Sequence, residues 1–213
     1  MEVINPVVRR WQREALETPD VFWARAAEAL PWFRLWDTVY EADYPSFRWF
    51  VGGETNIAYA ALDQHVKNGH GDQTALIYVT ERGERRAFTY SQLLHEVERV
   101  AAALRGMGIQ KGDRITIYMP TSPEAIIAML AATRIGAIHV VVFAGFGAGA
   151  LADRARASGS KLLLTADITY RKGKDVPLKG IVDTAAAMLG DSLEHVIVLK
   201  RGSGAVAMTP GRD

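Results

Sequence analysis

Apolar and polar positions alternate in blocks along residues 111–199. Short apolar runs typical of buried strands are separated by longer stretches whose apolar residues recur every three or four positions, as in amphipathic helices. The predicted strands are residues 114–119, 138–142, 161–165 and 195–199. The helices predicted between them start near residues 123, 148 and 179. Because strands and helices alternate over short connections, right-handed strand–helix–strand units are favoured, and we expect an α/β fold with a parallel sheet.

The run AIHVVVF at residues 137–143 is apolar at nearly every position. A half-buried strand would alternate, so the unbroken run is typical of a central parallel strand that is covered on both faces. We interpret His139 within it as a histidine satisfied in the core or at the end of the sheet. None of the five histidines has a partner at metal-ligand spacing on one helix, so the pattern does not indicate a metal site.

The N-terminal third has a different pattern. Residues 6–30 predict two short helices, with Thr18 as the N-cap of the second. Residues 31–55 contain eight aromatic side chains without regular periodicity, so we expect an irregular extension that packs them on the domain surface. A platform for stacking bases is the alternative, but acidic residues accompany Arg34 and Arg48, whereas such platforms are paired with a basic groove.

Helices and strands are predicted again after residue 56. Asn56 predicts the cap of a helix that ends at residues 68–69, and residues 74–80 and 85–90 predict a strand pair. A further helix is predicted to start at Thr89 or Ser91 and to end near residue 106, where glycines follow. We therefore expect an N-terminal extension over residues 1–70 and a sheet domain over residues 71–213.

Composition limits the classes of partner. The 213 residues are 49% hydrophobic and 23% charged, with a net charge of +1, which gives no support for a nucleic-acid binder. No run reaches the roughly 18 apolar residues expected of a membrane span, and residues 1–20 lack the apolar core of a signal peptide. The absence of cysteine excludes disulfides and thiolate chemistry and suits a reducing cytosol. We expect a cytoplasmic protein whose partners are small molecules, without a nucleic-acid or membrane partner.

Two segments carry candidate chemistry. Glycines follow the second predicted strand in AGFGAG (144–149), and positive charge follows the third in RKGK (171–174). The carboxyl ends of parallel strands meet at one edge of a sheet, where phosphorylated ligands bind in open α/β folds. Glycine allows close approach of the backbone, and Arg171 and Lys174 would supply cations for a phosphate. On the residues alone, a solvated surface loop is the more ordinary interpretation of RKGK.

Long segments in a fixed order resemble the N-terminal part of acetyl-CoA and propionyl-CoA synthetases, within the adenylate-forming acyl-CoA synthetase superfamily. The matching segments are RWFVGGETNIAYAALDQHV (48–66), FTYSQLLHEVERVAAALRGMGIQKGDRITIYMP (88–120), SPEAIIAMLAATRIGAIHVVVFAGF (122–146) and the stretch from LLTAD to PLK (163–179). Such enzymes use ATP and Mg²⁺ to activate a carboxylate as an acyl-adenylate, with release of pyrophosphate. Coenzyme A then takes the acyl group and AMP leaves.

The resemblance implies that this chain is the N-terminal portion of the large domain of an adenylate-forming enzyme, preceded by the extension of the family. It also implies that two loops line a partial site for the nucleotide end of coenzyme A. The residues of that implied site are Phe143, Ala144, Gly145, Arg171, Lys174 and Val176. No catalytic residue and no metal ligand is assigned to this chain.

Several positions depart from the family pattern. Gly147 replaces a serine that would cap the following helix, and Gly149 lies in the first turn of that helix. Lys174 replaces a common arginine, so a point charge stands where a bidentate fork is usual. Residues 60, 61 and 64 also differ from the usual asparagine, cysteine and arginine. We expect a weakened helix and a looser loop at the coenzyme A site.

The motifs that bind ATP and Mg²⁺, the acyl pocket and the catalytic lysine of the family are expected beyond residue 213. We therefore expect a partial enzyme that forms no acyl-adenylate alone and that has an incomplete core with a sticky sheet edge. Two alternatives stay open: a stand-alone module that binds coenzyme A or a separately encoded remainder of the enzyme, and a pseudogene product without activity. The DNA immediately downstream would discriminate between them.

Overall fold

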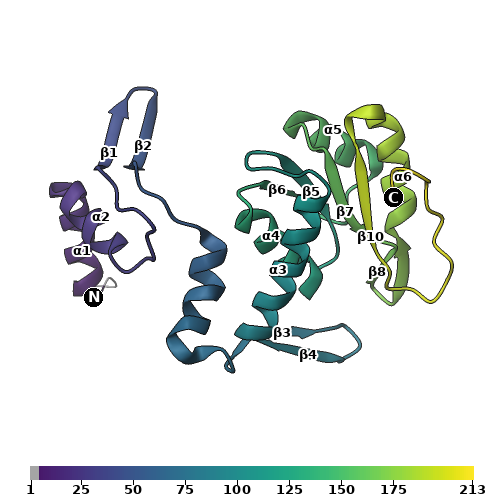
Figure 1. Ribbon diagram of the computed structural model, residues 1–213, viewed down its shortest axis with the longest axis horizontal. Coiled ribbons are helices and arrows are strands. Elements are labelled where there is room, and N and C mark those ends of the chain that lie inside the picture. Colours follow the sequence, from purple (N-terminus) through teal and green to yellow (C-terminus); the bar gives the residue numbers. More distant parts are fainter. Residues whose placement is uncertain (1–4) are drawn as a thin grey trace. The chain divides into compact units, whose positions relative to one another are not determined.

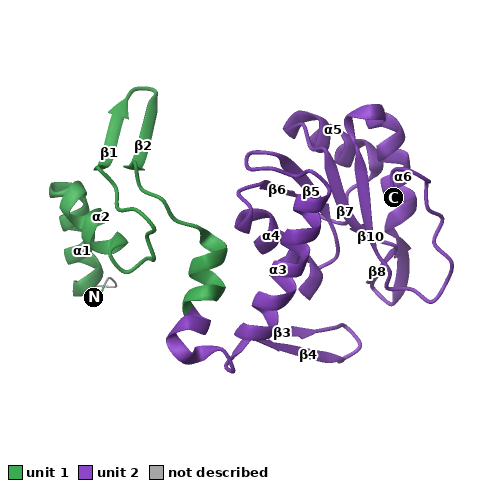
Figure 2. Ribbon diagram, in the orientation of Figure 1, with its two compact units in different colours: residues 1–64 green, residues 65–213 purple. Residues whose placement is uncertain are grey.

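The computed structural model describes residues 5–213, and the chain divides into two compact units, residues 1–64 and residues 65–213 (Figure 2). The smaller unit holds two helices and a β-hairpin, and the larger unit holds a sheet with its helices (Figure 1). Within residues 5–213, no helix combines the length and the apolar character that crossing a membrane requires.

The smaller unit begins with two helices, α1 (Pro6–Glu17) and α2 (Pro19–Ala27). Asn5 caps the first helix, because its side-chain oxygen accepts a hydrogen bond of 2.8 Å from the amide of Val7. Thr18 was predicted to cap the second helix but makes no such bond. Its hydroxyl donates instead to the carbonyl of Glu14 at 3.2 Å, so Thr18 satisfies the end of α1.

A β-hairpin formed by β1 (Thr38–Asp43) and β2 (Ser46–Val51) follows, which corrects the prediction of an irregular segment. Tyr40 lies opposite Trp49, and their ring centroids are 4.7 Å apart. The alternation expected of a strand is hidden because Trp49, Phe50 and Val51 are consecutive and all apolar. Aromatic contacts across the hairpin stabilise it where a regular pattern is missing.

Asn56 caps the next helical segment as predicted, because its side-chain oxygen accepts hydrogen bonds from the amides of Ala58 (2.9 Å) and Tyr59 (3.2 Å). The segment contains two π-helical turns, η1 (Tyr59–Asp63) and η2 (Val66–His70). Helical geometry is interrupted at Gly69, whose φ of 82° lies in the left-handed region that glycine adopts without strain.

The larger unit is built on a four-stranded parallel sheet with the spatial order β10-β7-β5-β6 (Figure 1). Its strands are β5 (Arg114–Tyr118), β6 (Ile138–Val141), β7 (Leu162–Ala166) and β10 (His195–Leu199). All three strand pairs are parallel, so the predicted α/β architecture is confirmed. One detail is wrong: β6 was predicted to be central, but within the described residues it lies at the edge of the sheet.

Four long helices accompany the sheet: α3 (Tyr90–Gly106), α4 (Pro123–Arg134), α5 (Ala148–Ser158) and α6 (Leu178–Leu189). The crossover from β5 to β6 and the crossover from β6 to β7 run in opposite directions along the sheet. Because such crossovers are right-handed, α4 and α5 leave toward opposite faces. Helix α3 packs with α4, and α5 packs with α6, which gives one pair on each face.

Helix starts in this unit follow the predicted capping signals. Thr89 accepts a hydrogen bond from the amide of Gln92, whose side chain bonds back to the amide of Thr89, forming a capping box. Ser122 caps α4 by accepting from the amide of Ala125. The main core between the sheet and α5 and α6 includes Tyr118, Val142, Leu151, Leu163, Leu178 and Val182.

Shorter elements complete the unit. They are the hairpin β3 (Thr74–Val79) with β4 (Arg85–Thr89), the hairpin β8 (Ile168–Arg171) with β9 (Lys174–Pro177), and the 3₁₀ turn η3 (Gly190–Ser192). The first hairpin confirms the predicted strand pair. The second corrects the predicted loop after the third strand of the sheet.

The C-terminal residues of the chain lie against the sheet. The amide of Val196 in β10 donates to the carbonyl of Arg212 at 2.9 Å. The side chain of Asp213 is 0% exposed and lies 2.9 Å from the ammonium of Lys179, whose side chain is 7% exposed. Burial favours the neutral form of Asp213, but Arg212 and Lys179 outweigh it and lower its pKa to about 2.

Candidate functional site

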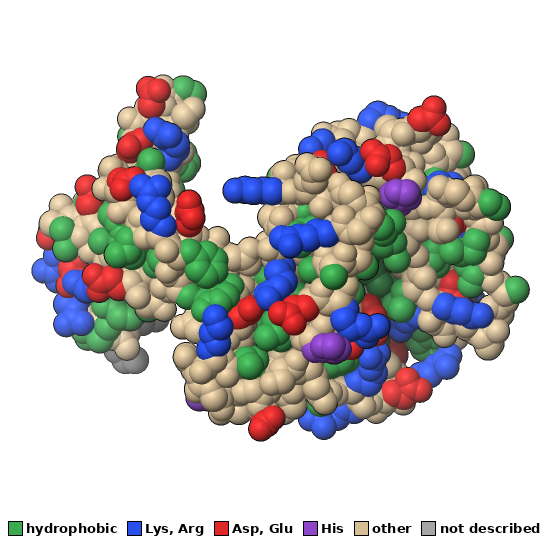
Figure 3. Space-filling model, viewed as in Figure 1, with side chains coloured by type: hydrophobic (Ala, Val, Ile, Leu, Met, Phe, Trp, Pro, Cys, Tyr) green, Lys and Arg blue, Asp and Glu red, His purple; other side chains and the backbone are tan. Residues whose placement is uncertain are grey.

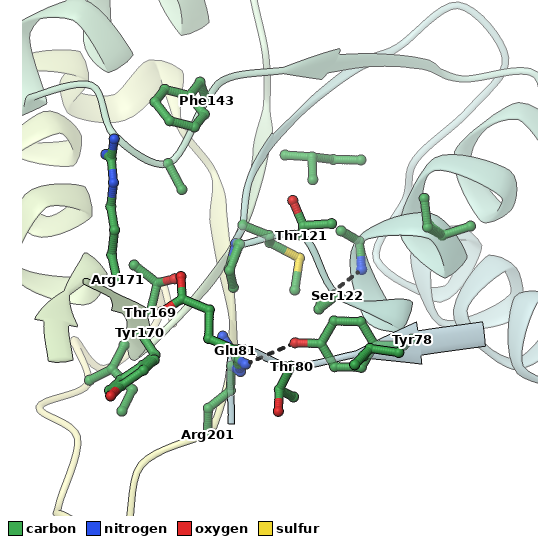
Figure 4. A pocket seen from close by; sticks show the side chains of 18 of the residues that line it. Tyr78, Thr80, Glu81, Thr121, Ser122, Phe143, Thr169, Tyr170, Arg171 and Arg201 are labelled. Atoms are coloured by element: carbon green, nitrogen blue, oxygen red, sulfur yellow. Dashed lines mark hydrogen bonds between the residues drawn. The ribbon is translucent and has the colours of Figure 1, made fainter. Parts of the chain in front are cut away.

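An open cleft of about 1060 Å³ lies at the carboxyl ends of β5, β6 and β7. Helices leave the sheet toward opposite faces at this point, which is where open α/β sheets bind ligands. The hairpin β3–β4 forms one wall and the hairpin β8–β9 forms another (Figure 4). Residues that line the cleft include Tyr78, Met119, Thr121, Phe143, Tyr170, Arg171 and Arg201.

The loop after β6 carries three of the predicted site residues. The amide of Phe146 donates to the carbonyl of Phe143 at 3.0 Å, so the loop forms a tight turn. The hydroxyl of Tyr118, at the end of β5, donates to the carbonyl of Phe146 at 2.6 Å and fixes the turn to the sheet. Burial raises the pKa of Tyr118, so its hydroxyl remains a donor at neutral pH.

Gly145 leaves room for two side chains that pack against this turn. A Cβ atom at position 145 would lie 2.8 Å from Nη1 of Arg171 and would overlap the ring of Phe143. The guanidinium of Arg171 lies over that ring, 5.5 Å from its centroid, as a cation–π contact. Phe143, Gly145 and Arg171 were predicted to share a site, and the structure brings all three together. Figure 4 shows Phe143 and Arg171 at the cleft.

The basic segment is a β-hairpin, not a loop. Lys172 and Gly173 form its two-residue turn with φ values of 51° and 77°, as in a type I′ turn. Arg171 and Lys174 are directly opposite each other in the register, so their side chains project from the same face of the hairpin. Like charges in this position repel, and an anion between them would relieve the repulsion.

The two remaining predicted site residues, Ala144 and Val176, contact the core. Ala144 and Val176 are partly buried and pack against the core beneath α5 and α6. Ala144 also lines the cleft. Through these contacts the Phe143 loop and strand β9 pack on the core.

Asp167 is a positioning residue that the sequence reasoning missed. It follows β7 directly and is 6% exposed. Its carboxylate accepts hydrogen bonds from the amides of Ile168 (2.8 Å), Arg201 (2.8 Å) and Gly202 (2.9 Å). Burial opposes the charge, but these bonds outweigh it and lower the pKa of Asp167. The carboxylate therefore joins the base of β8–β9 to the end of β10.

Two further arginines stand at the rim of the cleft. The guanidinium of Arg82 lies over the ring of Tyr170, 4.2 Å from its centroid. Nη2 of Arg201 donates a long hydrogen bond of 3.5 Å to the hydroxyl of Tyr78 (Figure 4). Neither arginine was singled out, because each is isolated in the sequence and reaches the cleft only through the fold.

The arrangement is suited to binding an anion with an aromatic or apolar portion. The exposed Phe143 and three arginines (Arg82, Arg171 and Arg201) line the cleft, and so do three acidic residues (Glu81, Glu84 and Asp175), whereas Lys174 is not among the lining residues. Within residues 5–213, no group of three acidic or histidine side chains could hold a metal ion. Elsewhere on the visible face of residues 65–213, acidic and basic side chains are interspersed (Figure 3). The site is therefore a local feature and not part of a broad basic surface.

Comparison with known families defines the class of the protein. The profile of the family described as "AMP-binding enzyme" matches residues 62–208, and that described as "Acetyl-coenzyme A synthetase N-terminus" matches residues 8–61. The chain belongs to the AMP-binding enzyme family and carries the N-terminal region of the acetyl-coenzyme A synthetase type, as the resemblance implied.

Individual acyl-CoA synthetases are similar to this chain. The chain is 52% identical over 205 residues to the acetyl-coenzyme A synthetase of Deinococcus radiodurans, covering 96% of this chain and 31% of the relative. It is 45% identical over 205 residues to the 3-hydroxypropionyl-coenzyme A synthetase of Sulfurisphaera tokodaii, covering 94% of this chain and 31% of that protein. A solved structure, the acetoacetyl-CoA synthetase from Streptomyces lividans, is similar with a TM-score of 0.86 and 28% identity, covering 94% of this chain and 31% of that one. The chain thus spans about a third of the length of these relatives.

Proposed function

We propose that this chain is the N-terminal part of an ATP-dependent short-chain acyl-CoA ligase, which converts a carboxylate, ATP and coenzyme A into acyl-CoA, AMP and pyrophosphate. The observation that carries the proposal is the likeness to an acetyl-coenzyme A synthetase along nearly the whole chain, at 52% identity. The lack of cysteine is consistent with a cytoplasmic location.

The residues present fit the phosphorylated end of coenzyme A. Arg171 and Lys174 offer two cations from one face of a hairpin, and Gly145 keeps the backbone open beside them. Phe143 is 60% exposed and offers an aromatic surface next to Arg171. In this role the two cations bind the 3′-phosphate, while the Phe143–Gly145 turn orients the adenosine end. When bound, coenzyme A supplies the group that accepts the acyl moiety.

The expected affinity of the chain alone is weak. Two charge-assisted contacts contribute about 1–3 kcal/mol each, less the cost of ordering two exposed side chains. That range corresponds to a dissociation constant no better than roughly millimolar. We assign no residue of this chain to ATP or Mg²⁺, so catalysis belongs to the portion of the relatives that lies outside the match.

The test compares coenzyme A with its dephospho form, on the wild-type chain and on the Arg171→Ala, Lys174→Ala double variant. We expect coenzyme A to bind more tightly than the dephospho form, and the difference to vanish in the double variant and to shrink with salt. Arg105→Ala, which removes an exposed cation from α3, is the control and should leave binding unchanged. Equal affinity in all four combinations would show that the hairpin is a solvated turn without this role.

Activity is tested separately. We expect the 213-residue chain to catalyse no acetate-dependent exchange of pyrophosphate into ATP, because this reaction needs the charge of the ATP phosphates to be neutralised and we assign no residue of this chain to ATP or Mg²⁺. Measurable exchange would refute the proposal that the chain is inactive alone. Tight, micromolar binding of coenzyme A without exchange would favour the alternative of a stand-alone binding module, and neither binding nor exchange would favour a product without activity.

A further inference from the structure

Two arginine–tyrosine contacts join the walls of the cleft. The guanidinium of Arg82, in the turn between β3 and β4, lies 4.2 Å from the centroid of the Tyr170 ring on β8. Nη2 of Arg201, shortly after β10, donates to the hydroxyl of Tyr78 on β3 at 3.5 Å. Each contact connects the hairpin β3–β4 to the part of the unit that carries the hairpin β8–β9, and the proposed binding of coenzyme A uses neither.

The turn that carries Arg82 has a defined shape. The amide of Gly83 donates to the carbonyl of Thr80 at 3.0 Å, and the amide of Thr80 donates to the carbonyl of Glu84 at 2.9 Å. The hydroxyl of Thr80 accepts a further hydrogen bond of 3.1 Å from the amide of Glu84. These bonds fix the backbone on both sides of Arg82, so its side chain reaches the cleft from an ordered turn.

The hairpin β8–β9 depends on contacts with the rest of the unit. Its strands have four residues each and, within the described residues, pair only with each other. An isolated two-stranded hairpin is at best marginally stable in water, so contacts outside the hairpin decide its orientation. Asp167 holds its base, and Val176 packs on the core. Arg82 adds a contact to Tyr170, which is the residue next to Arg171.

The two faces of β8–β9 carry opposite charge. In the register, Tyr170 lies opposite Asp175, and Arg171 lies opposite Lys174. Because side chains along a strand alternate between its faces, one face carries the tyrosine with an acid and the other carries two cations. In Figure 4, Tyr170 and Arg171 extend from β8 in opposite directions. Register is weakly specified in a short polar hairpin, and a slip of one residue would exchange the faces. The cation of Arg82 favours the observed register, because it covers the acidic face.

We propose that Arg82 is a positioning residue for the coenzyme A site: its contact with the Tyr170 ring holds the β8–β9 hairpin in the orientation that presents the hairpin's two cations to a phosphate. The proposal rests on the proposed function and adds to it a residue outside the predicted site. Arg82 acts through Tyr170 and does not itself bind the phosphate. A cation–π contact at an exposed site is weak, so its loss should reduce the affinity for coenzyme A about two- to fivefold and leave the fold intact.

The first measurement is amide hydrogen exchange of the ligand-free 213-residue chain, which does not depend on coenzyme A. Arg82→Met and Tyr170→Leu should each speed exchange over residues 168–176 about two- to fivefold, because the hairpin opens more easily. The double variant should exchange no faster than Tyr170→Leu alone, since both substitutions remove the same contact. Tyr170→Phe keeps the ring and should restore the exchange rates of the wild type. Exchange in β5 is the internal reference for an intact fold.

The second measurement is titration of coenzyme A and its dephospho form against the same variants. Arg82→Met and Tyr170→Leu should each weaken the binding of coenzyme A about two- to fivefold, with a smaller effect on the dephospho form and no further loss in the double variant. Arg85→Met is the matched control, because Arg85 is an exposed cation on β4 of the same hairpin and is not among the residues that line the cleft. It removes the same charge and should change the affinity by less than about 1.5-fold.

The outcomes separate the positioning role from the proposed function. Unchanged exchange over residues 168–176 in Arg82→Met, or an equal loss of affinity in Arg85→Met, would overturn the positioning role. Losses of affinity that add in the double variant would overturn it as well, because they would show that Arg82 contacts the ligand directly. Equal wild-type affinity for the two forms of coenzyme A, together with faster exchange in Arg82→Met, would contradict the proposed function alone, since the hairpin would still depend on Arg82.

Discussion

Replacing Asp167 by alanine should destabilise the larger unit and release the hairpin that carries Arg171. The substitution removes a buried carboxylate and leaves the amides of Ile168, Arg201 and Gly202 without their acceptor. Arg201 and Gly202 lie 34 and 35 residues away in the sequence, so their bonds exist only in the folded state.

The magnitude follows from these bonds. A hydrogen bond to a charged group contributes about 1.5–3 kcal/mol, and a buried amide left without an acceptor costs a comparable amount. The bond to Ile168 is local and can form in the unfolded chain, and water can reach the exposed Arg201, so the three contributions do not sum in full. We expect Asp167→Ala to lower the free energy of unfolding by about 2–4 kcal/mol.

Asp167→Asn separates hydrogen bonding from charge. An asparagine oxygen at the Oδ1 position can still accept from Ile168 and Arg201, whereas its amide group faces Gly202 as a second donor. The expected cost is about 1–2 kcal/mol, between wild type and the alanine variant. Asp153→Asn is the control, because Asp153 pairs with Arg156 on an exposed helix surface and should cost less than about 0.5 kcal/mol.

Urea denaturation followed by circular dichroism at pH 7 measures these differences, and repeating it at lower pH tests the charge. The folded-state pKa of Asp167 is lowered, so its contribution is present above the unfolded pKa and is lost as the pH falls through the folded value. The gap between wild type and Asp167→Ala should therefore narrow below about pH 4. An alanine variant within 0.5 kcal/mol of wild type, or a gap that widens in acid, would refute the role of Asp167.

The remaining predictions concern two other structural features of the larger unit. Lys179→Met should lower the free energy of unfolding by about 3–5 kcal/mol, because it leaves the fully buried carboxylate of Asp213 without one of its two cations. A decrease in the free energy of unfolding no larger than that caused by replacing an exposed lysine would contradict this. Asp213→Asn should remove a contribution to stability that is present at neutral pH and is lost as the pH falls toward about 2. The pH-dependent part of this contribution is at most about 2.4 kcal/mol from the pKa difference, and urea denaturation from pH 7 to 3 measures its decline; a wild-type stability that does not approach that of the variant in acid would contradict this. Gly149→Ala should stabilise the unit by up to about 1 kcal/mol in thermal denaturation, since position 149 is helical and a Cβ atom there meets no neighbour; destabilisation would show that the glycine has a conformational role.

Local signals in the sequence predicted most of the larger unit. Thr89 and Ser122 are helix caps, and each is followed by apolar residues at helical spacing. The four predicted apolar runs form the four strands of the parallel sheet. The hairpin β8–β9 was missed because its turn is Lys172-Gly173, which lacks the usual asparagine or aspartate before the glycine. Tyr118 was missed as a support of the Phe143 loop because its acceptor lies 28 residues away, and no local pattern reports such a bond.

Two features of the larger unit depart from local physical rules. Arg171 and Lys174 oppose each other with like charge, and β6 presents an apolar edge with a histidine nitrogen that has no partner within residues 5–213. The charges around Asp213, by contrast, are compensated inside the chain. Local departures that persist without internal compensation are expected at functional sites, because they are satisfied by what binds there. An anion between Arg171 and Lys174 would satisfy the hairpin, whereas the buried Nδ1 of His139, which has no partner within residues 5–213, corrects the interpretation of a satisfied histidine.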